Sequence, residues 1–111
     1  LRQRFQFADR NITFVSNRRN VTLPIADIRY VESNDTEVWI YATDDRKFRN
    51  KTPISQWENL LGDDFVRIHR SYLVHRSYIT SVSADSLMVG ETRLPISRKY
   101  SASVRSQERG L

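Results

Sequence analysis

One segment of the sequence places an arginine where an apolar residue would be expected. Around positions 65–75, four side chains fall on one face of an extended chain and should point into the core: Val66, Ile68, Tyr72 and Val74. Arg70 falls in the same phase, and an unpaired guanidinium is very costly to bury. We therefore expect the backbone to bend or bulge between His69 and Ser71, so that Arg70 points to solvent. An arginine displayed at such a kink is well placed to reach the edge of a base; the alternative is a structural arginine paired with an acidic residue.

A second basic segment, Ser97-Arg98-Lys99, begins the last predicted helix. Ser97 is expected to cap this short helix, in which Tyr100 and Val104 share one face. Two cations in the first turn are unfavourable beside the positive end of the helix dipole, by about 0.3–1 kcal/mol each. A bound anion would reverse the sign, because free N–H groups, the Ser97 hydroxyl and both cations would converge on it. A DNA phosphate is the natural candidate, and an exposed basic turn without a ligand is the alternative.

The charge distribution agrees with a polyanionic partner. The 111-residue chain has a formal net charge of +5. Residues 1–66 carry ten Lys and Arg against ten Asp and Glu, whereas residues 67–111 carry eight against three, so the second section supplies the whole excess. A basic excess confined to one section indicates a surface for a polyanion, although a solubilising charge bias would give the same pattern.

Composition and motifs argue against several other classes. With 39% hydrophobic and 28% charged residues, the chain is an ordinary single globular domain. It has no cysteine, which rules out disulfides and thiolate metal sites and fits a reducing compartment. No apolar run is long enough to span a bilayer, and no signal peptide begins the chain.

An enzyme is not expected either. Asp64, His69 and Ser71 suggest a catalytic triad only superficially, because no glycine-framed nucleophile accompanies them. The two histidines lack a metal-ligand spacing, and the three glycines form no phosphate-binding loop. We therefore expect neither catalysis nor a cofactor.

Short alternating segments predict a mostly-β domain with two short helices and no helix-turn-helix. Strands are expected at residues 12–14, 21–23, 28–32, 38–41, 47–49, 65–68, 72–74, 79–82, 87–89 and 93–96. Residues 17–20 between the first two predict a hairpin turn, in which Asn suits left-handed positions. A polar loop at 33–36 separates the third and fourth strands.

The first helix should begin with Thr52 as cap and Pro53 at its first position, and end at Gly62. Its apolar stripe should pack in the core: Ile54, Trp57 and Leu61. Because the chain does not begin with Met, we expect a piece of a longer protein. Residues 1–9 are then a linker remnant, residues 10–105 the domain, and residues 106–111 a frayed C-terminal tail.

The segment FVRIHRSYLV at residues 65–74, followed by Ile79, resembles the signature of LytTR-type domains. These are DNA-binding output modules of LytR/AlgR-like bacterial response regulators. Three flanking features agree in order: the segment IRYVE at 28–32 before a polar loop, the helix at 52–61, and LPISR at 94–98. The resemblance covers about residues 10–105, nearly the whole chain.

The resemblance implies elongated, mostly antiparallel β-sheets in a sandwich-like fold, whose loops enter successive major grooves in place of a recognition helix. It implies sequence-specific binding of double-stranded DNA at direct repeats in promoters, often with bending, by a cytoplasmic transcription regulator of a two-component system. The longer protein would carry an N-terminal receiver domain or a membrane sensor segment, and two copies would form a dimer on the DNA.

By motif position, the resemblance also assigns the contacts. The base-reading candidates are Arg70, Arg98 and the loop of Thr36, Glu37 and Val38. The phosphate candidates are His69, Ser71, Ser97 and Lys99. Arginine suits bidentate reading of guanine O6 and N7.

Two positions depart from the family pattern. Where the family often has Gly-Asn-Tyr, this chain has Asp35-Thr36-Glu37, and a carboxylate there would either accept a bond from cytosine N4 or repel DNA. Where Asn commonly follows the Leu-Val pair, this chain has His75, which we interpret as a local structural substitution. The alternative function is a β-rich protein–protein interaction module whose basic face binds an acidic partner.

Overall fold

The computed structural model describes the backbone of residues 10–109 and the side chains of residues 10–104; the expected linker at 1–9 and residues 110–111 lie outside this part. Within it the chain forms ten strands: β1 (Asn11–Ser16), β2 (Arg19–Pro24), β3 (Ile28–Asn34), β4 (Glu37–Ala42), β5 (Lys47–Asn50), β6 (Phe65–His69), β7 (Tyr72–His75), β8 (Ile79–Val82), β9 (Ser86–Val89) and β10 (Thr92–Pro95). The helices are α2 (Ile54–Leu61), α3 (Arg98–Arg109) and the short 3-10 turns η1 (Ile25–Asp27), η2 (Gly62–Asp64) and η3 (Arg76–Tyr78).

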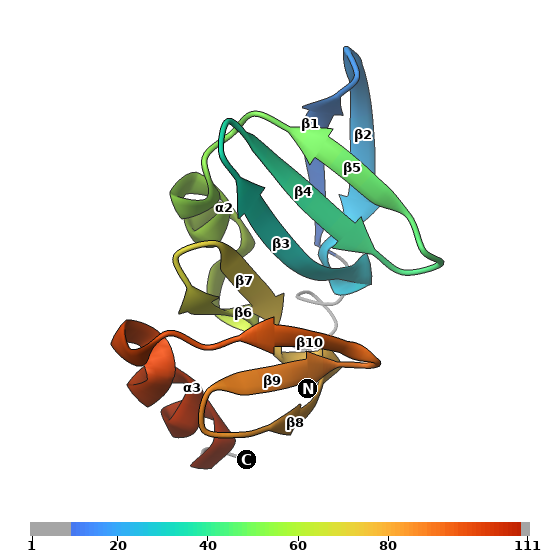
Figure 1. The fold of residues 1–111 in the computed structure, drawn as a ribbon. Helices are drawn as coiled ribbons and strands as arrows, with labels where there is room; N and C mark the ends of the chain where they lie inside the picture. The colour runs from blue at the N-terminus through green and yellow to red at the C-terminus, as the bar shows by residue number, and fades with distance from the viewer. Residues whose placement is uncertain (1–9, 110–111) are drawn as a thin grey trace.

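The strands form three antiparallel sheets, which Figure 1 shows one beside the next. A hairpin of β1 and β2 is followed by a central sheet in the order β5-β4-β3-β7-β6 and by a third sheet in the order β10-β9-β8. All strand pairs in the described part are antiparallel. The predicted mostly-β, antiparallel fold is therefore confirmed, and each strand lies within two residues of its predicted bounds.

The central sheet is covered on one face along its length, and on the other face mainly over β3, β7 and β6. One face packs against the β1–β2 hairpin and α2, in a core that includes Phe14, Leu23, Val31, Trp57 and Leu73. The other face packs against the third sheet and α3, in a core that includes Tyr30, Ile68, Val74, Leu87 and Val104. Because successive side chains of a strand point to opposite faces, neighbouring residues such as Leu73 and Val74 enter different cores.

The β1–β2 turn confirms the predicted hairpin. Asn17 and Arg18 adopt positive φ angles of 52° and 65°, the left-handed region that a two-residue turn between twisted strands requires. Asparagine tolerates this region better than most residues, whereas Arg18 pays a small steric cost there. The turn places Arg18 in an exposed position at the tip of the hairpin.

Helix α2 forms as predicted at its core face and its end, but not at its start. Ile54, Trp57 and Leu61 are buried, and Gly62, with φ of 77°, ends the helix. The predicted cap at Thr52 is wrong: Pro53, in an extended conformation, is the N-cap residue, and no side chain caps the helix. The reason is that Asn50 Oδ1 accepts the Thr52 N–H at 2.7 Å and the Trp57 indole N–H at 3.2 Å, which fixes an extended chain before the helix.

Helices α2 and α3 are separated in sequence by strands β6–β10, so they are not consecutive and do not form a helix-turn-helix. Helix α3 extends to Arg109 and is longer than expected; it includes residues 106–109, which the sequence analysis assigned to the tail. No helix in the described part is long and apolar enough to cross a membrane.

His75 is a core residue, as we interpreted it. Its side chain is 7% exposed, meets the rings of Phe65 and Tyr78 edge to face, and its Nδ1 accepts the Ser77 N–H at 3.1 Å. Burial lowers the pKa of His75 below its usual 6.5; Arg76 adds to the shift and Asp64 opposes it. The imidazole is therefore neutral in the folded protein near neutral pH.

This burial predicts a pH dependence of stability. In the unfolded chain His75 is protonated below about pH 6.5, whereas in the folded chain burial disfavours its protonation. The free energy of unfolding should therefore fall as the pH drops from about 6.5 towards the lowered folded-state pKa. The loss is at most about 1.4 kcal/mol per pH unit. His75→Asn keeps an acceptor for the Ser77 N–H without a titrating group. Urea unfolding of both proteins between pH 7 and 5 should show a smaller loss for the variant. Equal losses would contradict the assignment to His75.

Candidate nucleic-acid interface

The turn between β6 and β7 presents Arg70. Val66, Ile68 and Val74 are buried in one core and Tyr72 packs partly buried against it, while Arg70 is exposed. The expected irregular backbone between the two strands is confirmed: a two-residue hairpin turn at Arg70 and Ser71 follows a register shift between Arg67 and His69. His69 Nδ1 accepts the Ser71 N–H at 3.0 Å, which stabilises the turn from inside.

Arg67 holds this turn from below. Its Nε donates to the His69 carbonyl at 2.8 Å, one terminal nitrogen to the Arg70 carbonyl at 2.6 Å, and the other to Glu58 Oε1 of α2 at 2.8 Å. Its side chain is only 12% exposed. The three nitrogens of a planar guanidinium reach separate acceptors in fixed directions, whereas the three donors of a lysine lie on one rotating ammonium nitrogen. Arg67 therefore sets the position of the turn relative to α2.

The start of α3 lies against the same turn. The Ser97 N–H donates to the Ile68 carbonyl at 2.9 Å, and the Tyr100 ring lies within cation–π range of both Arg67 (5.6 Å) and Lys99 (5.4 Å). Arg98 and Lys99 are exposed. The exposed cations Arg98 and Lys99 thus lie in the first turn of α3, where the helix dipole is itself positive, while the charge of Arg67 is already paired with Glu58. This arrangement favours a bound anion.

The expected cap by the Ser97 side chain is not formed. Ser97 Oγ is buried and has no hydrogen-bond partner among the residues that the structure describes. The Ser97 carbonyl accepts the Tyr100 N–H at 3.1 Å, so the backbone begins the helix as predicted while the hydroxyl faces inward. In this conformation the Ser97 hydroxyl cannot reach a ligand in solvent.

The β3–β4 turn is shorter than the predicted loop. Of the three base-reading candidates there, only Thr36 lies in the turn, and Glu37 and Val38 lie in β4. Asp35, with φ of 54°, and the exposed Thr36 form the turn. Glu37 lies in β4 with its carboxylate 3.7 Å from the Arg49 guanidinium. Val38 is 3% exposed and belongs to the core, because the strand begins one residue before it and points it inward. Its side chain is not available for a base contact.

Two backbone hydrogen bonds connect the three segments. The Ser33 N–H, next to the β3–β4 turn, donates to the Ser71 carbonyl at 2.8 Å, and the Ser97–Ile68 bond joins the β6–β7 turn to α3. In Figure 1 the β6–β7 turn and the start of α3 lie one above the other on the left, with the β3–β4 turn above them. Segments about 30 residues apart in sequence therefore form one continuous edge.

Glu32 supports this edge in a way that the sequence analysis missed. Its carboxylate accepts the hydroxyl of Tyr72 at 2.9 Å and of Tyr41 at 3.0 Å, so it joins three strands. Burial, and then the hydrogen bond to Glu32, raise the pKa of Tyr72 to about 12, so its hydroxyl stays a donor. Glu32 and Tyr72 are cross-strand partners, which only the pairing of β3 with β7 reveals.

The family model of the LytTr DNA-binding domain matches residues 18–108. The chain belongs to the LytTR family. This confirms the resemblance, and the family is one of DNA-binding domains, not of enzymes. A solved LytTr DNA-binding domain from Bacillus cereus has the same fold as this LytTR domain, with a TM-score of 0.75 and 24% sequence identity over 86% of this chain and 94% of that chain. No curated protein sequence matches the chain.

Arg67 gives a test of how this edge is held. Arg67→Met keeps the aliphatic stem but removes three charge-assisted hydrogen bonds, so it should lower the free energy of unfolding by about 2–3 kcal/mol and speed hydrogen exchange of the Ser71 and Ser97 amides. Glu58→Gln leaves both backbone bonds of Arg67 and should cost less than about 1 kcal/mol, because Glu58 is 44% exposed. Denaturant unfolding and amide exchange by NMR measure both. If hydrogen exchange of the Ser71 amide is unchanged in Arg67→Met, Arg67 does not hold the β6–β7 turn in place.

Proposed function

We propose that this LytTR domain is the sequence-specific DNA-binding output domain of a bacterial transcription regulator, and that the edge formed by the β3–β4 turn, the β6–β7 turn and the start of α3 contacts the duplex. The observation that carries the proposal is the convergence of these three segments in a member of a DNA-binding family. Such an edge fits turns entering a groove, since neither α-helix of the described part stands free to do so.

The exposed arginines are the proposed readers of base edges. Arg70 and Arg98 lie at the tips of neighbouring segments, and an arginine fork matches the two acceptors of guanine in the major groove. Thr36, exposed in the β3–β4 turn, is a further candidate. Glu37 is a weaker one, because it already pairs with Arg49 and its carboxylate would face phosphates. Val38 is not proposed as a DNA contact, because its side chain is buried.

Phosphate contacts are assigned to the residues around the arginines. Lys99, with its point charge, and the half-exposed His69 and Ser71 flank Arg70 and Arg98 on the same edge. The Ser97 hydroxyl is not part of the proposal, because it faces inward. Phosphate contacts fix the register of the protein on DNA and supply most of the salt-dependent affinity.

The wider role follows the family. We propose that the domain works in the cytoplasm at direct repeats in promoters, as the output domain of a two-component response regulator, where two copies bind successive sites. A receiver domain or membrane sensor segment in the longer protein would control it. The alternative, a protein–protein interaction module, predicts weak and sequence-blind binding of DNA.

Selection of random duplexes on the purified domain, followed by sequencing, tests the proposal directly. Enrichment of one motif, with binding that weakens steeply as salt rises, is the expected result. Enrichment of two copies separated by about one or two helical turns would support direct repeats. No enriched motif would favour the interaction module.

Arg70→Ala separates a DNA contact from a structural role. The guanidinium is exposed and the Arg67 bond goes to the Arg70 backbone, so the melting temperature should stay nearly unchanged, within about 0.5 kcal/mol of stability. Affinity for the selected duplex should fall tenfold or more, on the scale of about 1–3 kcal/mol for one bidentate base contact. Thermal melting and fluorescence anisotropy on the same sample measure both. A large drop in melting temperature would mark Arg70 as structural.

Arg98 and Lys99 should differ although they are neighbours. Arg98→Ala should weaken binding of the selected duplex by about 1–3 kcal/mol and relax preference at one base pair. Lys99→Ala should weaken binding of all duplexes and reduce the slope of log affinity against log salt by about one unit. Titrations with selected and scrambled duplexes at several salt concentrations compare them. Identical behaviour of the two variants would refute these roles.

A further inference from the structure

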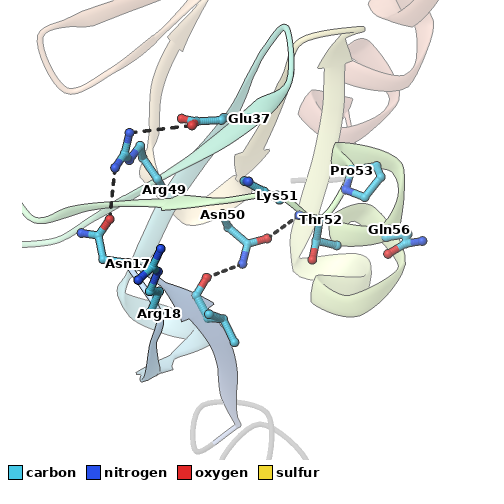
Figure 2. Close-up of a pocket in the computed structure, with 10 residues that line it drawn as sticks. Asn17, Arg18, Glu37, Arg49, Asn50, Lys51, Thr52, Pro53 and Gln56 are labelled. Atoms are coloured by element: carbon cyan, nitrogen blue, oxygen red, sulfur yellow. Dashed lines mark hydrogen bonds and ion pairs between the residues drawn. The ribbon is translucent and has the colours of Figure 1, made fainter.

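A basic groove lies next to the edge described above, at the start of α2. It has a volume of about 660 Å³ and runs between the β1–β2 turn, strand β5 and the start of α2 (Figure 2). Three cations line it, Arg18, Arg49 and Lys51, against a single carboxylate, Glu37. These cations come from residues 1–66, where charges balance overall, so the sequence did not draw attention to them.

Two of the lining side chains build the groove. Arg49 binds Asn17 Oδ1 at 3.2 Å and the Glu37 carboxylate at 3.7 Å, while the buried Asn50 donates to the Val15 carbonyl at 2.7 Å. These contacts join the β1–β2 hairpin to β5. In Figure 2, Arg49 and Glu37 are bonded to each other, and Arg49 is also bonded to Asn17, within the groove.

The two remaining cations of the groove take no part in the contacts that join the hairpin to β5. Arg18, at the tip of the hairpin, and Lys51, between β5 and α2, are both exposed. Neither forms an ion pair with a carboxylate of residues 10–104. The one carboxylate of the groove is neutralised by Arg49, so Arg18 and Lys51 leave an excess of positive charge.

The groove continues into the proposed DNA-contacting edge. A neighbouring depression, beside the β3–β4 turn, is lined by Asp35, Thr36 and Arg67, and it shares Glu37, Lys51 and Pro53 with the groove. A surface therefore leads from the turn that flanks the base-reading arginines, past Lys51, to Arg18.

We propose that this groove binds the sugar-phosphate backbone of the duplex outside the base-reading segments, with Arg18 and Lys51 each contacting a phosphate. The inference rests on the proposed DNA-binding function and extends its footprint. Duplex DNA fits because it is a polyanion that continues past the recognition edge, and release of its condensed counterions makes each phosphate contact favourable. The contacts carry affinity and no base preference.

The experiment uses two variants and a matched control on the whole chain. Arg18→Asn removes the charge and places a residue that tolerates the positive φ of 65°; Lys51→Gln removes the other charge. Arg19→Asn is the control, since Arg19 is the exposed neighbour of Arg18 at the start of β2 and does not line the groove. Binding of the selected duplex and of a scrambled duplex is titrated between 50 and 300 mM salt, roughly the range over which phosphate contacts are lost.

Each groove variant should reduce the salt slope by about one unit, and the double variant by about two, equally on both duplexes. The motif selected from random duplexes should be unchanged, and Arg19→Asn should keep the wild-type slope. Shortening the duplex on the side of the groove should remove the difference between wild type and the double variant.

Unchanged slopes, or equal losses in Arg19→Asn, would overturn the groove as a binding site. The proposed function would still stand if Arg70→Ala loses specific affinity in the same assay. If the wild-type chain binds duplexes weakly and without sequence preference, the function fails, and the groove inference fails with it.

Discussion

Strands β3, β7 and β6 of the central sheet lie between two cores, and this constraint decides where their charged residues can lie. A strand between two cores has no solvent-facing side, so its polar groups must be paired or moved to its ends. Glu32 shows the first solution, since two tyrosine hydroxyls satisfy its carboxylate. Arg70 shows the second, since it lies in the apolar phase of β6 and β7 but at the turn between them. The interface edge is therefore a consequence of how the sheet is packed.

Arg67 joins this packing to the proposed function. It is largely buried, yet its three bonds reach two carbonyls of the β6–β7 hairpin and a carboxylate of α2. Its guanidinium also lies over Tyr100 at the start of α3. Desolvating an arginine is costly, and the cost is offset because each of the three guanidinium nitrogens has an acceptor. A side chain that holds turns in place lowers the entropy that those turns lose on binding DNA.

In the proposed interface, turns and a helix start form an extended contact surface in place of one recognition helix. The basic groove at the β1–β2 hairpin would extend this surface with charges that contact phosphates and not bases. Such a division is common in protein–DNA recognition, where phosphate contacts position the protein and a few side chains specify the sequence. The proposed phosphate contacts of the groove fall on other turns than the proposed base-reading arginines, so substitutions there can separate affinity from specificity.

Local sequence was sufficient for the strands, the family and the exposure of Arg70, because alternation of apolar residues and turn residues such as Asn17 and Gly62 act over a few positions. It was insufficient where partners are distant along the chain. Asn50, and not Thr52, fixes the chain before α2, and Val38 is buried because it shares the inward face of β4 with Ile40.

The same limit explains the residues that were missed. Nothing near Arg67 in the sequence identifies its acceptors at Glu58 and in the following turn, and nothing near Arg18 predicts that Lys51 lies on the same groove. Local periodicity determines which face a side chain prefers. Only the pairing of strands and the packing of three sheets decide which distant groups meet there, because those contacts depend on the whole chain being folded.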